Sequence, residues 1–215
     1  MFNKVHILSV GYSRSDPLDS NVMLANCTST LIKTRCGKNI IVDTMTAWDG
    51  EVIVKALKQH SLEPKDINYV VCTHGHSDHI GCNYLFTNAD LHFVASCMSY
   101  RDKYPNYDWV QPYSLIVGEV EIIRTPGHTS DCVSLLVNNT DLGGTVGVCG
   151  DLFENGQDVW DSQIWTNAGS ENQKLQKENR LMLAKLCSYI IPGHGNGFIV
   201  TDDIRNKLQQ DFNEI

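Results

Sequence analysis

The chain has 215 residues, 42% of them hydrophobic and 20% charged, and this composition predicts one globular domain over residues 1–215. Its formal net charge of −8 argues against a bulk electrostatic hold on nucleic acid. Residues 1–8 lack the long apolar segment of a secretion signal, and no apolar run is long enough to span a membrane. With eight cysteines and no Cys-x-x-Cys pair, the protein is expected to carry reduced thiols in the cytoplasm.

Strand-like and helix-like segments alternate along the chain, with no linker or repeat between them. Short apolar runs bounded by turn residues predict strands over 5–11, 21–33, 40–43, 69–72, 91–95, 115–117, 120–124 and 132–137. The turn at 35–39 predicts that the second and third of these strands pair as a hairpin.

Periodicity and capping residues also predict helices. The expected helices run from Asp49 to Lys58, over 79–87, over 171–187 and from Asp202 onward. Ser170 with Gln173 resembles a capping box, and the helix after it is expected to bury Leu175, Met182, Leu183 and Leu186. Strand-rich halves with helices outside them predict an α/β fold in which two sheets pack face to face and are covered on both sides.

The segment Thr73-His74-Gly75-His76-Ser77-Asp78-His79-Ile80-Gly81 is the most informative in the chain. It holds three imidazoles and one carboxylate within six residues, and these groups are the usual ligands of zinc and non-haem iron. Its small residues allow the backbone to curl and to direct all four side chains at one place. The segment therefore predicts a metal site directly after a buried strand.

Three further segments each place a metal-binding residue type beside glycine after an apolar run, and these residues are His128, Asp151 and His194. In order and spacing, the three segments and the His-x-His-x-Asp-His motif resemble the metallo-β-lactamase superfamily over nearly the whole chain. The resemblance is strongest to the glyoxalase-II-like branch. Coincidence is a poor explanation for an ordered set of seven such residues.

This resemblance implies a four-layer αβ/βα sandwich with two divalent metal ions, zinc or alternatively iron, at one edge between the sheets. The ligands that it implies are, for one ion, His74, His76 and His128; for the other, Asp78, His79 and His194; and, bridging both, Asp151. A hydroxide between the ions would be the nucleophile. The catalytic role of Asp78 and Asp151 would be to offset the four positive charges of the two ions with their carboxylates.

Asp43 follows the apolar run 40–42, and in the resemblance it matches an aspartate that supports a metal-binding histidine from outside the metal shell. The superfamily pattern there is Asp-Thr-Gly, and this chain has Met45 in place of the glycine. That departure concerns the shape of the loop and not the metal ligands. A turn residue after a strand is the alternative interpretation of Asp43.

Three aromatic residues are candidates for substrate contact: Tyr12 in the loop after the first strand, and Trp160 and Trp165 in the polar stretch after Asp151. Their flat rings can stack on a ligand or bury apolar area. Packing under a long loop is therefore the alternative for the two tryptophans.

A shared fold does not determine a substrate, so several functions fit such a site. One is phosphodiester hydrolysis, and the resemblance implies an endoribonuclease that acts on histone pre-messenger RNA, in the nucleus as well as the cytoplasm. The net acidity and the lack of a nucleic-acid-binding domain oppose it. We expect no room in this chain for the inserted cap or RNA-gripping arm of larger nucleases.

The alternatives are thioester hydrolysis as in glyoxalase II, persulfide oxidation at a single iron, and a binding module without activity. The glutathione-binding helical domain of glyoxalase II has no counterpart after His194, and the complete set of seven residues disfavours an inactive module. We interpret the chain as a metal-dependent hydrolase with a dinuclear zinc centre that acts on a phosphodiester. Its expected partners are RNA or a small (thio)ester and no membrane, and a homodimer is implied by the resemblance alone.

Overall fold

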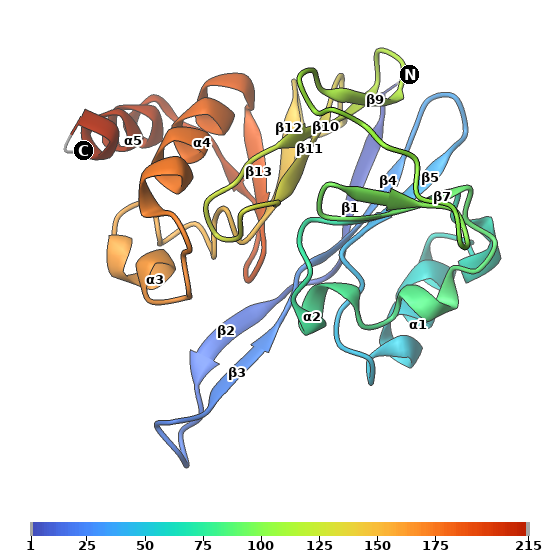
Figure 1. Cartoon of the computed structure of the whole chain (residues 1–215), viewed down its shortest axis with the longest axis horizontal. Coiled ribbons are helices and arrows are strands. Elements are labelled where there is room, and N and C mark those ends of the chain that lie inside the picture. The colour runs from blue at the N-terminus through green and yellow to red at the C-terminus, as the bar shows by residue number, and fades with distance from the viewer. Residues whose placement is uncertain (1, 214–215) are drawn as a thin grey trace.

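Two six-stranded sheets occupy the centre of the computed structural model, which describes residues 2–213 (Figure 1). The first sheet has, in spatial order, β1 (Lys4–Ser9), β4 (Ser29–Lys33), β5 (Asn39–Val42), β6 (Tyr69–Cys72), β7 (Leu91–Val94) and β8 (Cys97–Ser99). The second has β14 (Phe198–Ile199), β13 (Tyr189–Pro192), β12 (Val146–Gly150), β11 (Val133–Val137), β10 (Val120–Arg124) and β9 (Tyr113–Ile116).

Helices cover the outer face of each sheet and complete four layers (Figure 1). The α-helices are α1 (Gly50–Gln59), α2 (Ser77–Ile80), α3 (Ser162–Thr166), α4 (Gln173–Leu186) and α5 (Asp202–Asn213), and the 3₁₀ helices are η1 (Pro64–Asp66) and η2 (Asn83–Leu85). Helix α1 lies outside the first sheet, and α4 and α5 lie outside the second. The predicted αβ/βα sandwich is confirmed. Within residues 2–213, no helix has the length and apolar character that crossing a membrane requires.

The alternation of side chains along each strand builds three apolar layers. In β5, for example, Ile40 and Val42 point between the sheets, whereas Ile41 packs under α1 with Ile53 and Leu57. A third layer joins the second sheet to α4 and α5. Strands buried on both faces therefore read as continuous apolar runs, which made them easy to predict.

A two-stranded arm projects from the edge of the sandwich (Figure 1). Its strands are β2 (Tyr12–Ser15) and β3 (Met23–Asn26), which pair antiparallel. The sequence predicted one continuous strand over 21–33 in place of β3 and β4. The strand is interrupted because Thr28 bonds elsewhere. Its backbone N donates to the carbonyl of Gly193 at 2.6 Å, and its hydroxyl donates to the carbonyl of Gly195 at 2.9 Å.

Helix α4 differs from its prediction in both its cap and its buried face. Asn172, not Ser170, is the N-cap, and its side chain accepts a hydrogen bond from the backbone N of Leu175 at 3.1 Å. Leu186 is exposed, whereas the polar Gln176 and Arg180 face inward. These two side chains are buried because they bond to the loop after β12. A buried face predicted from the helical spacing of apolar residues does not include them.

The helix predicted over 79–87 is broken into α2 and η2. The chain turns at the break because backbone N–H groups there bond to the loop after β5. Gly81 N donates to the Met45 carbonyl at 2.8 Å, and Cys82 N donates to the Thr44 carbonyl at 3.2 Å. The loop that carries Asp43 is thereby joined to the end of the histidine motif.

Candidate metal centre

Five loops that each follow a strand meet at one edge of the sandwich, and the loop after β10 carries His128. Strands β5 and β6 are parallel, as are β12 and β13, so the carboxyl ends of each pair open on one edge. Asp43 follows β5, the histidine motif follows β6, Asp151 follows β12, and His194 lies two residues after β13. The topology therefore brings together residues that lie up to about 150 positions apart.

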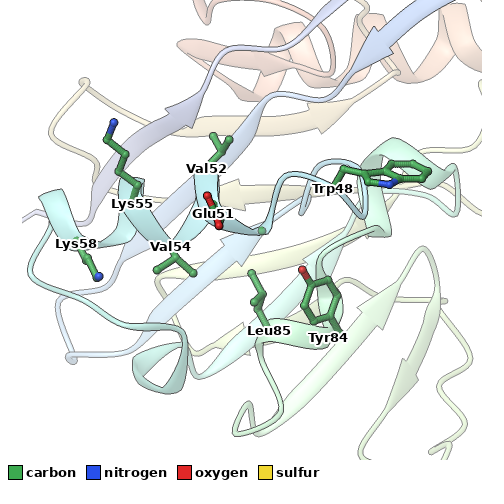
Figure 2. A pocket seen from close by; sticks show the side chains of 9 residues that line it. Trp48, Glu51, Val52, Val54, Lys55, Lys58, Tyr84 and Leu85 are labelled. Atoms are coloured by element: carbon green, nitrogen blue, oxygen red, sulfur yellow. The ribbon is translucent and has the colours of Figure 1, made fainter.

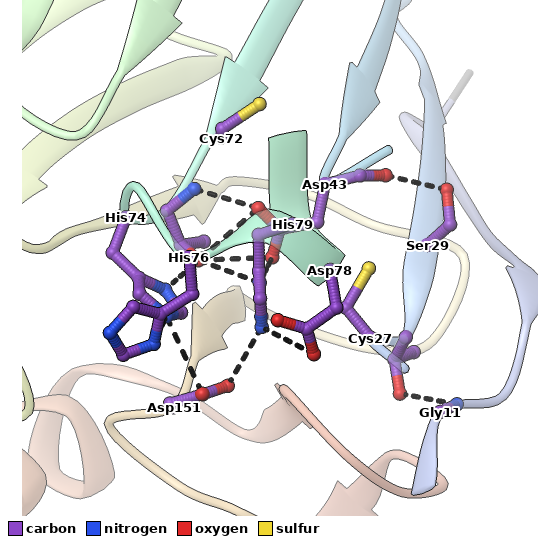
Figure 3. A network of polar contacts seen from close by, with 12 residues as sticks. Gly11, Cys27, Ser29, Asp43, Cys72, His74, His76, Asp78, His79 and Asp151 are labelled. Atoms are coloured by element: carbon purple, nitrogen blue, oxygen red, sulfur yellow. Dashed lines mark hydrogen bonds and ion pairs between the residues drawn. The ribbon is translucent and has the colours of Figure 1, made fainter. Parts of the chain in front are cut away.

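The first cluster is formed by His74, His76, His128 and one oxygen of Asp151, and Figure 3 shows His74, His76 and Asp151 side by side. His76 Nδ1 lies 2.8 Å from His74 Nε2 and 3.1 Å from His128 Nε2. The Oδ2 atom of Asp151 lies 3.5 Å from His74 Nε2 and 3.4 Å from His128 Nε2. His74 and His128 are buried, whereas His76 is exposed, so the cluster lies at the surface end of the edge.

The second cluster is formed by Asp78, His79 and His194, beside the same Asp151. Oδ2 of Asp78 lies 3.8 Å from His79 Nε2 and 3.9 Å from His194 Nε2. Asp151 lies 3.2 Å from each of these two ring nitrogens, through Oδ1 to His79 and through Oδ2 to His194. One carboxylate therefore contacts both clusters, as expected for a bridging ligand.

The donor atoms of both clusters fit divalent cations. His79 Nε2 and Asp151 Oδ1 are buried and have no hydrogen-bond partner, although they lie 3.2 Å apart. In the first cluster, three imidazole nitrogens face one another, and an unprotonated nitrogen is a metal ligand. Unpaired buried polar atoms are costly, and ions between them would satisfy them. The structure brings all seven predicted ligands together, and their metal-binding roles stay a prediction.

The opposite ring nitrogens are held by groups outside the two clusters. His79 Nδ1 donates to Asp43 Oδ2 at 2.9 Å, and His194 Nδ1 donates to the carbonyl of Asn26 at 3.0 Å. Each bond leaves Nε2 free to face the cluster, which is how outer groups orient metal-binding histidines. Asp43 also accepts from the backbone N of Thr73 at 2.7 Å, so it connects two loops (Figure 3).

The protein groups of the centre fall into two kinds, those whose pKa is lowered by their surroundings and those whose pKa is raised. Burial lowers the pKa of His74 well below its usual value, and the neighbouring His79 adds to the effect. Burial opposes the charge of His79 too, but the Asp151 and Asp43 carboxylates outweigh it and raise its pKa. Burial is also the largest single influence on His194, but the charge and hydrogen bond of Asp151, together with the charge of Glu154, outweigh it and raise the pKa of His194 to about 9. Asp151 is itself buried, yet the surrounding imidazoles lower its pKa.

Glu154 is a member of the site that the sequence did not reveal as one. It lies three residues after Asp151, and its Oε2 atom is 3.9 Å from His194 Nε2. Burial and then the Asp151 charge raise the pKa of Glu154 to about 9. An acidic residue directly after the apolar pair Leu152-Phe153 was the available signal.

Helix α4 supports the loop that carries Asp151 and Glu154. Gln176 Nε2 donates to the carbonyl of Asp151 at 3.0 Å. The Arg180 guanidinium donates to both Asp158 oxygens, at 2.7 and 2.9 Å, and Asp158 accepts from the backbone N of Glu154 at 2.7 Å. This bidentate pair is almost completely buried and fixes the loop in one geometry.

The three aromatic candidates for substrate contact have different surroundings. Trp165 is 3% exposed, and its ring packs against the Arg180 guanidinium at 5.2 Å, which is the packing role given as its alternative. Trp160 is 57% exposed, and its contact with substrate stays a prediction. Tyr12 is 46% exposed and pairs across the arm with Asn26, the residue that holds His194. Tyr12 therefore lies at the base of the arm, close to the second cluster.

A cavity of about 340 Å³ lies between the arm and α3 and reaches Glu154. Apart from Met23, Ile164 and Ala168, it is lined by hydroxyl, amide and carboxyl side chains and by no cation: Ser13, Ser15, Glu154, Asn155, Asp161, Gln163 and Asn167. A separate cavity of about 740 Å³ lies along the outer face of α1, beside Trp48 and Tyr84 (Figure 2). None of the residues that line the second cavity belongs to the two clusters, so only the first adjoins the candidate centre.

Known proteins share both the sequence pattern and the fold. The profile of the Metallo-beta-lactamase superfamily matches residues 23–115. Metallo-beta-lactamase domain-containing protein 1 of Xenopus laevis is 37% identical over 201 residues, which cover 92% of this chain and 82% of that protein. This chain belongs to the metallo-beta-lactamase superfamily. The human protein of the same name is 36% identical over 163 residues, which cover 75% of this chain and 59% of the human protein.

Solved structures of the superfamily agree with the sandwich. An N-acyl homoserine lactone hydrolase, with its product bound at the catalytic metal centre, superposes with a TM-score of 0.64 at 22% identity. The match covers 90% of this chain and 94% of that one, and at this identity it shows the fold alone. The protein is thus a metallo-hydrolase of this superfamily with a candidate dimetal centre of histidines and aspartates.

Proposed function

We propose that this protein is a metal-dependent phosphodiester hydrolase that cleaves RNA internally, with histone pre-messenger RNA as the substrate class. The observation that supports the hydrolase most directly is the position of Asp151 between the clusters: its Oδ2 atom lies beside ring nitrogens of both, and its Oδ1 atom faces His79 of the second. Two divalent ions held there would supply a nucleophile at neutral pH, because bound water has a pKa of about 7 instead of 15.7, and would stabilise the leaving oxygen.

The protein's own residues would hold and balance that charge. Asp78 and Asp151 would offset part of the four positive charges, and the ions themselves would attract the oxygens of a phosphate. Asp43 keeps His79 in the tautomer that faces the centre, and the carbonyl of Asn26 does the same for His194. The substrate phosphate would therefore be oriented by a fixed set of groups.

The arm favours a single-stranded nucleic acid among phosphodiesters. Tyr12 is exposed at its base, and the exposed Arg14 guanidinium lies 5.4 Å from the centre of the Tyr12 ring. An aromatic ring beside a guanidinium can stack on a base and contact the backbone without any sequence preference. Such a protein would act on RNA in the nucleus and the cytoplasm, where we also place it.

The decisive experiment uses protein loaded with zinc and, in parallel, end-labelled single-stranded RNA, DNA of the same sequence, a lactone and S-lactoylglutathione. We expect internal cleavage of RNA that EDTA stops and that Asp151→Ala abolishes. Tyr12→Ala and Arg14→Ala are expected to weaken cleavage of RNA while leaving small esters unaffected. RNA that stays intact while an ester is hydrolysed would reject the RNA substrate and keep the hydrolase.

Ester or thioester hydrolysis is the second candidate, because the cavity beside Glu154 is lined by neutral and acidic groups and by no cation. Such a lining suits an uncharged polar group better than a polyanion. A mononuclear iron persulfide dioxygenase is distinguished in the same experiment by metal analysis and oxygen consumption. One iron per chain together with oxygen uptake would support the dioxygenase and reject the hydrolase.

A further inference from the structure

A third carboxyl group lies at the second cluster, beyond the seven ligands that the family pattern supplies. Glu154 is 2% exposed, and its donor atoms lie within 4.8 Å of those of Asp151 and His194. Its Oε2 atom is 3.9 Å from His194 Nε2, the nitrogen that also faces Asp78 and Asp151. The carboxyl group is thus on the metal-facing side of the His194 ring.

The backbone fixes Glu154 in this position from both sides. Its N–H donates to Asp158 Oδ2 at 2.7 Å, and its carbonyl accepts from the backbone N of His194 at 2.7 Å. Asp158 is in turn held by both donors of the buried Arg180 guanidinium. A side chain on such a rigid support keeps its place without a ligand, which is how metal sites are preorganised.

Apart from the His194 and His79 rings, the Glu154 carboxyl has no ion-pair partner among residues 2–213. Its Oε1 atom is buried and has no hydrogen-bond partner, and the nearby guanidinium of Arg180 is already paired with Asp158. Two further neighbours of fixed charge, the Asp151 and Asp158 carboxylates, both repel it. A cation beside His194 Nε2 would satisfy this group, and no other positive charge faces it among residues 2–213 except the His79 and His194 rings.

We propose that Glu154 is an additional ligand of the second ion, together with Asp78, His79, His194 and Asp151. The second position would then bind through two ring nitrogens and three carboxylates, and the first through three ring nitrogens and one carboxylate. Carboxylates favour harder ions such as Mn²⁺, whereas imidazole suits zinc. The two positions therefore differ in ion preference. This inference rests on the dinuclear centre of the proposed function.

The test measures ion binding in the full-length protein, without substrate. Chelator-treated wild-type protein, Glu154→Gln and Glu154→Asp are dialysed against Zn²⁺ alone or Mn²⁺ alone, and bound metal is counted by mass spectrometry. Glu119→Gln is the matched control, because Glu119 is 8% exposed and accepts from the backbone N of Arg35 at 2.9 Å, outside both clusters. Circular dichroism verifies that each variant is folded.

We expect Glu154→Gln to keep the first zinc and to bind the second ion about tenfold or more weakly, with the larger loss for Mn²⁺. Glu154→Asp keeps the charge but withdraws the oxygens, so it should lose second-ion affinity too. Crystals loaded with Mn²⁺ should place a Glu154 oxygen about 2.0–2.3 Å from one ion. Glu119→Gln should bind both ions as the wild type does.

The possible failures are distinguishable. A wild-type protein that binds no ion would remove the dinuclear centre, and with it the proposed function. Two ions bound equally by the wild type and Glu154→Gln would reject only the role of Glu154. Equal loss of both ions in Glu154→Gln, or an unchanged second ion in Glu154→Asp, would show that Glu154 supports the loop or supplies charge and is no ligand.

Discussion

Replacing Asp43 by asparagine should weaken metal binding without changing any predicted ligand. Asp43 is 1% exposed, its Oδ2 accepts from His79 Nδ1 at 2.9 Å, and its Oδ1 accepts from the backbone N of Thr73 at 2.7 Å. Its φ of +57° suits asparagine nearly as well as aspartate, so the loop should survive. The amide of Asp43→Asn, however, has one oxygen for two donors, and its NH₂ group must face one of them.

The size of the effect follows from these two bonds. Thr73 offers a backbone N–H that cannot be moved, so the amide oxygen stays there and the NH₂ group faces His79. In the neutral ring, which is the form that binds metal, the single proton then lies on Nε2, the atom that faces Asp151. Loss of such an outer partner typically weakens metal affinity by about 10–100-fold, or about 1.4–2.7 kcal/mol. The lost charge-assisted bond should also lower the free energy of unfolding of the ion-free protein by about 1.5–3 kcal/mol.

Competition between the protein and a chromogenic zinc chelator measures the first effect, and urea unfolding in EDTA measures the second. Asp141→Asn is the control, because Asp141 is exposed and accepts only a 3.2 Å bond from the backbone N of Val5. It should leave zinc affinity unchanged. Zinc dissociation constants for Asp43→Asn equal to those of the wild type would refute the role of Asp43 in orienting His79.

Three further changes test other parts of the centre. Asp151→Ala removes the shared carboxylate, so zinc content should fall below two ions and turnover by about a hundredfold or more; near-normal turnover would contradict the dinuclear arrangement. Because the pKa of His79 is raised and that of His194 is about 9 in the ion-free protein, both are protonated at pH 7. Zinc uptake should therefore release protons, and zinc affinity should increase as the pH rises from 6 to about 9. Calorimetry in buffers of different ionisation enthalpy measures the proton release, and a release of zero would disprove this prediction. Met45 has a φ of +59°, and both Met45→Gly and Met45→Ala lose its buried side chain beyond Cβ. Met45→Gly should nevertheless have the higher free energy of unfolding in urea, by about 1 kcal/mol, because alanine is strained at this φ. The reverse order would mean that the loop carries no strain.

The ligands could be predicted from the sequence because each lies close behind a strand that is itself easy to recognise. β6, β12 and β13 are continuous apolar runs, and the motif residues follow them within a few positions. Parallel pairing of β5 with β6 and of β12 with β13 then brings their ends together. Local pattern and topology agree here, so the residues that the resemblance names converge in space.

Apart from Asp43, which the resemblance named, the supporting groups could not be predicted, because their partners are distant in sequence. Arg180 is buried only because Asp158 receives it, and neither residue belongs to an apolar period. Thr28 interrupts its strand only because the loop around His194 offers a carbonyl to its N–H. Interactions of this kind depend on the assembled fold, so a method that works along the sequence assigns these residues to ordinary surface positions.

The charges of the centre also decide how an anionic substrate could be held. Two divalent ions would halve the formal charge of −8, yet all of their positive charge would lie at one edge of an acidic protein. A nucleic acid would then be attracted at the scissile phosphate and not along a basic track, because the cavity beside Glu154 has no cationic lining. Stacking on Tyr12 and contact with Arg14 would have to supply the rest of the binding free energy for the nucleic acid. That combination requires unstacked bases, so a duplex should be a poorer substrate than a single strand.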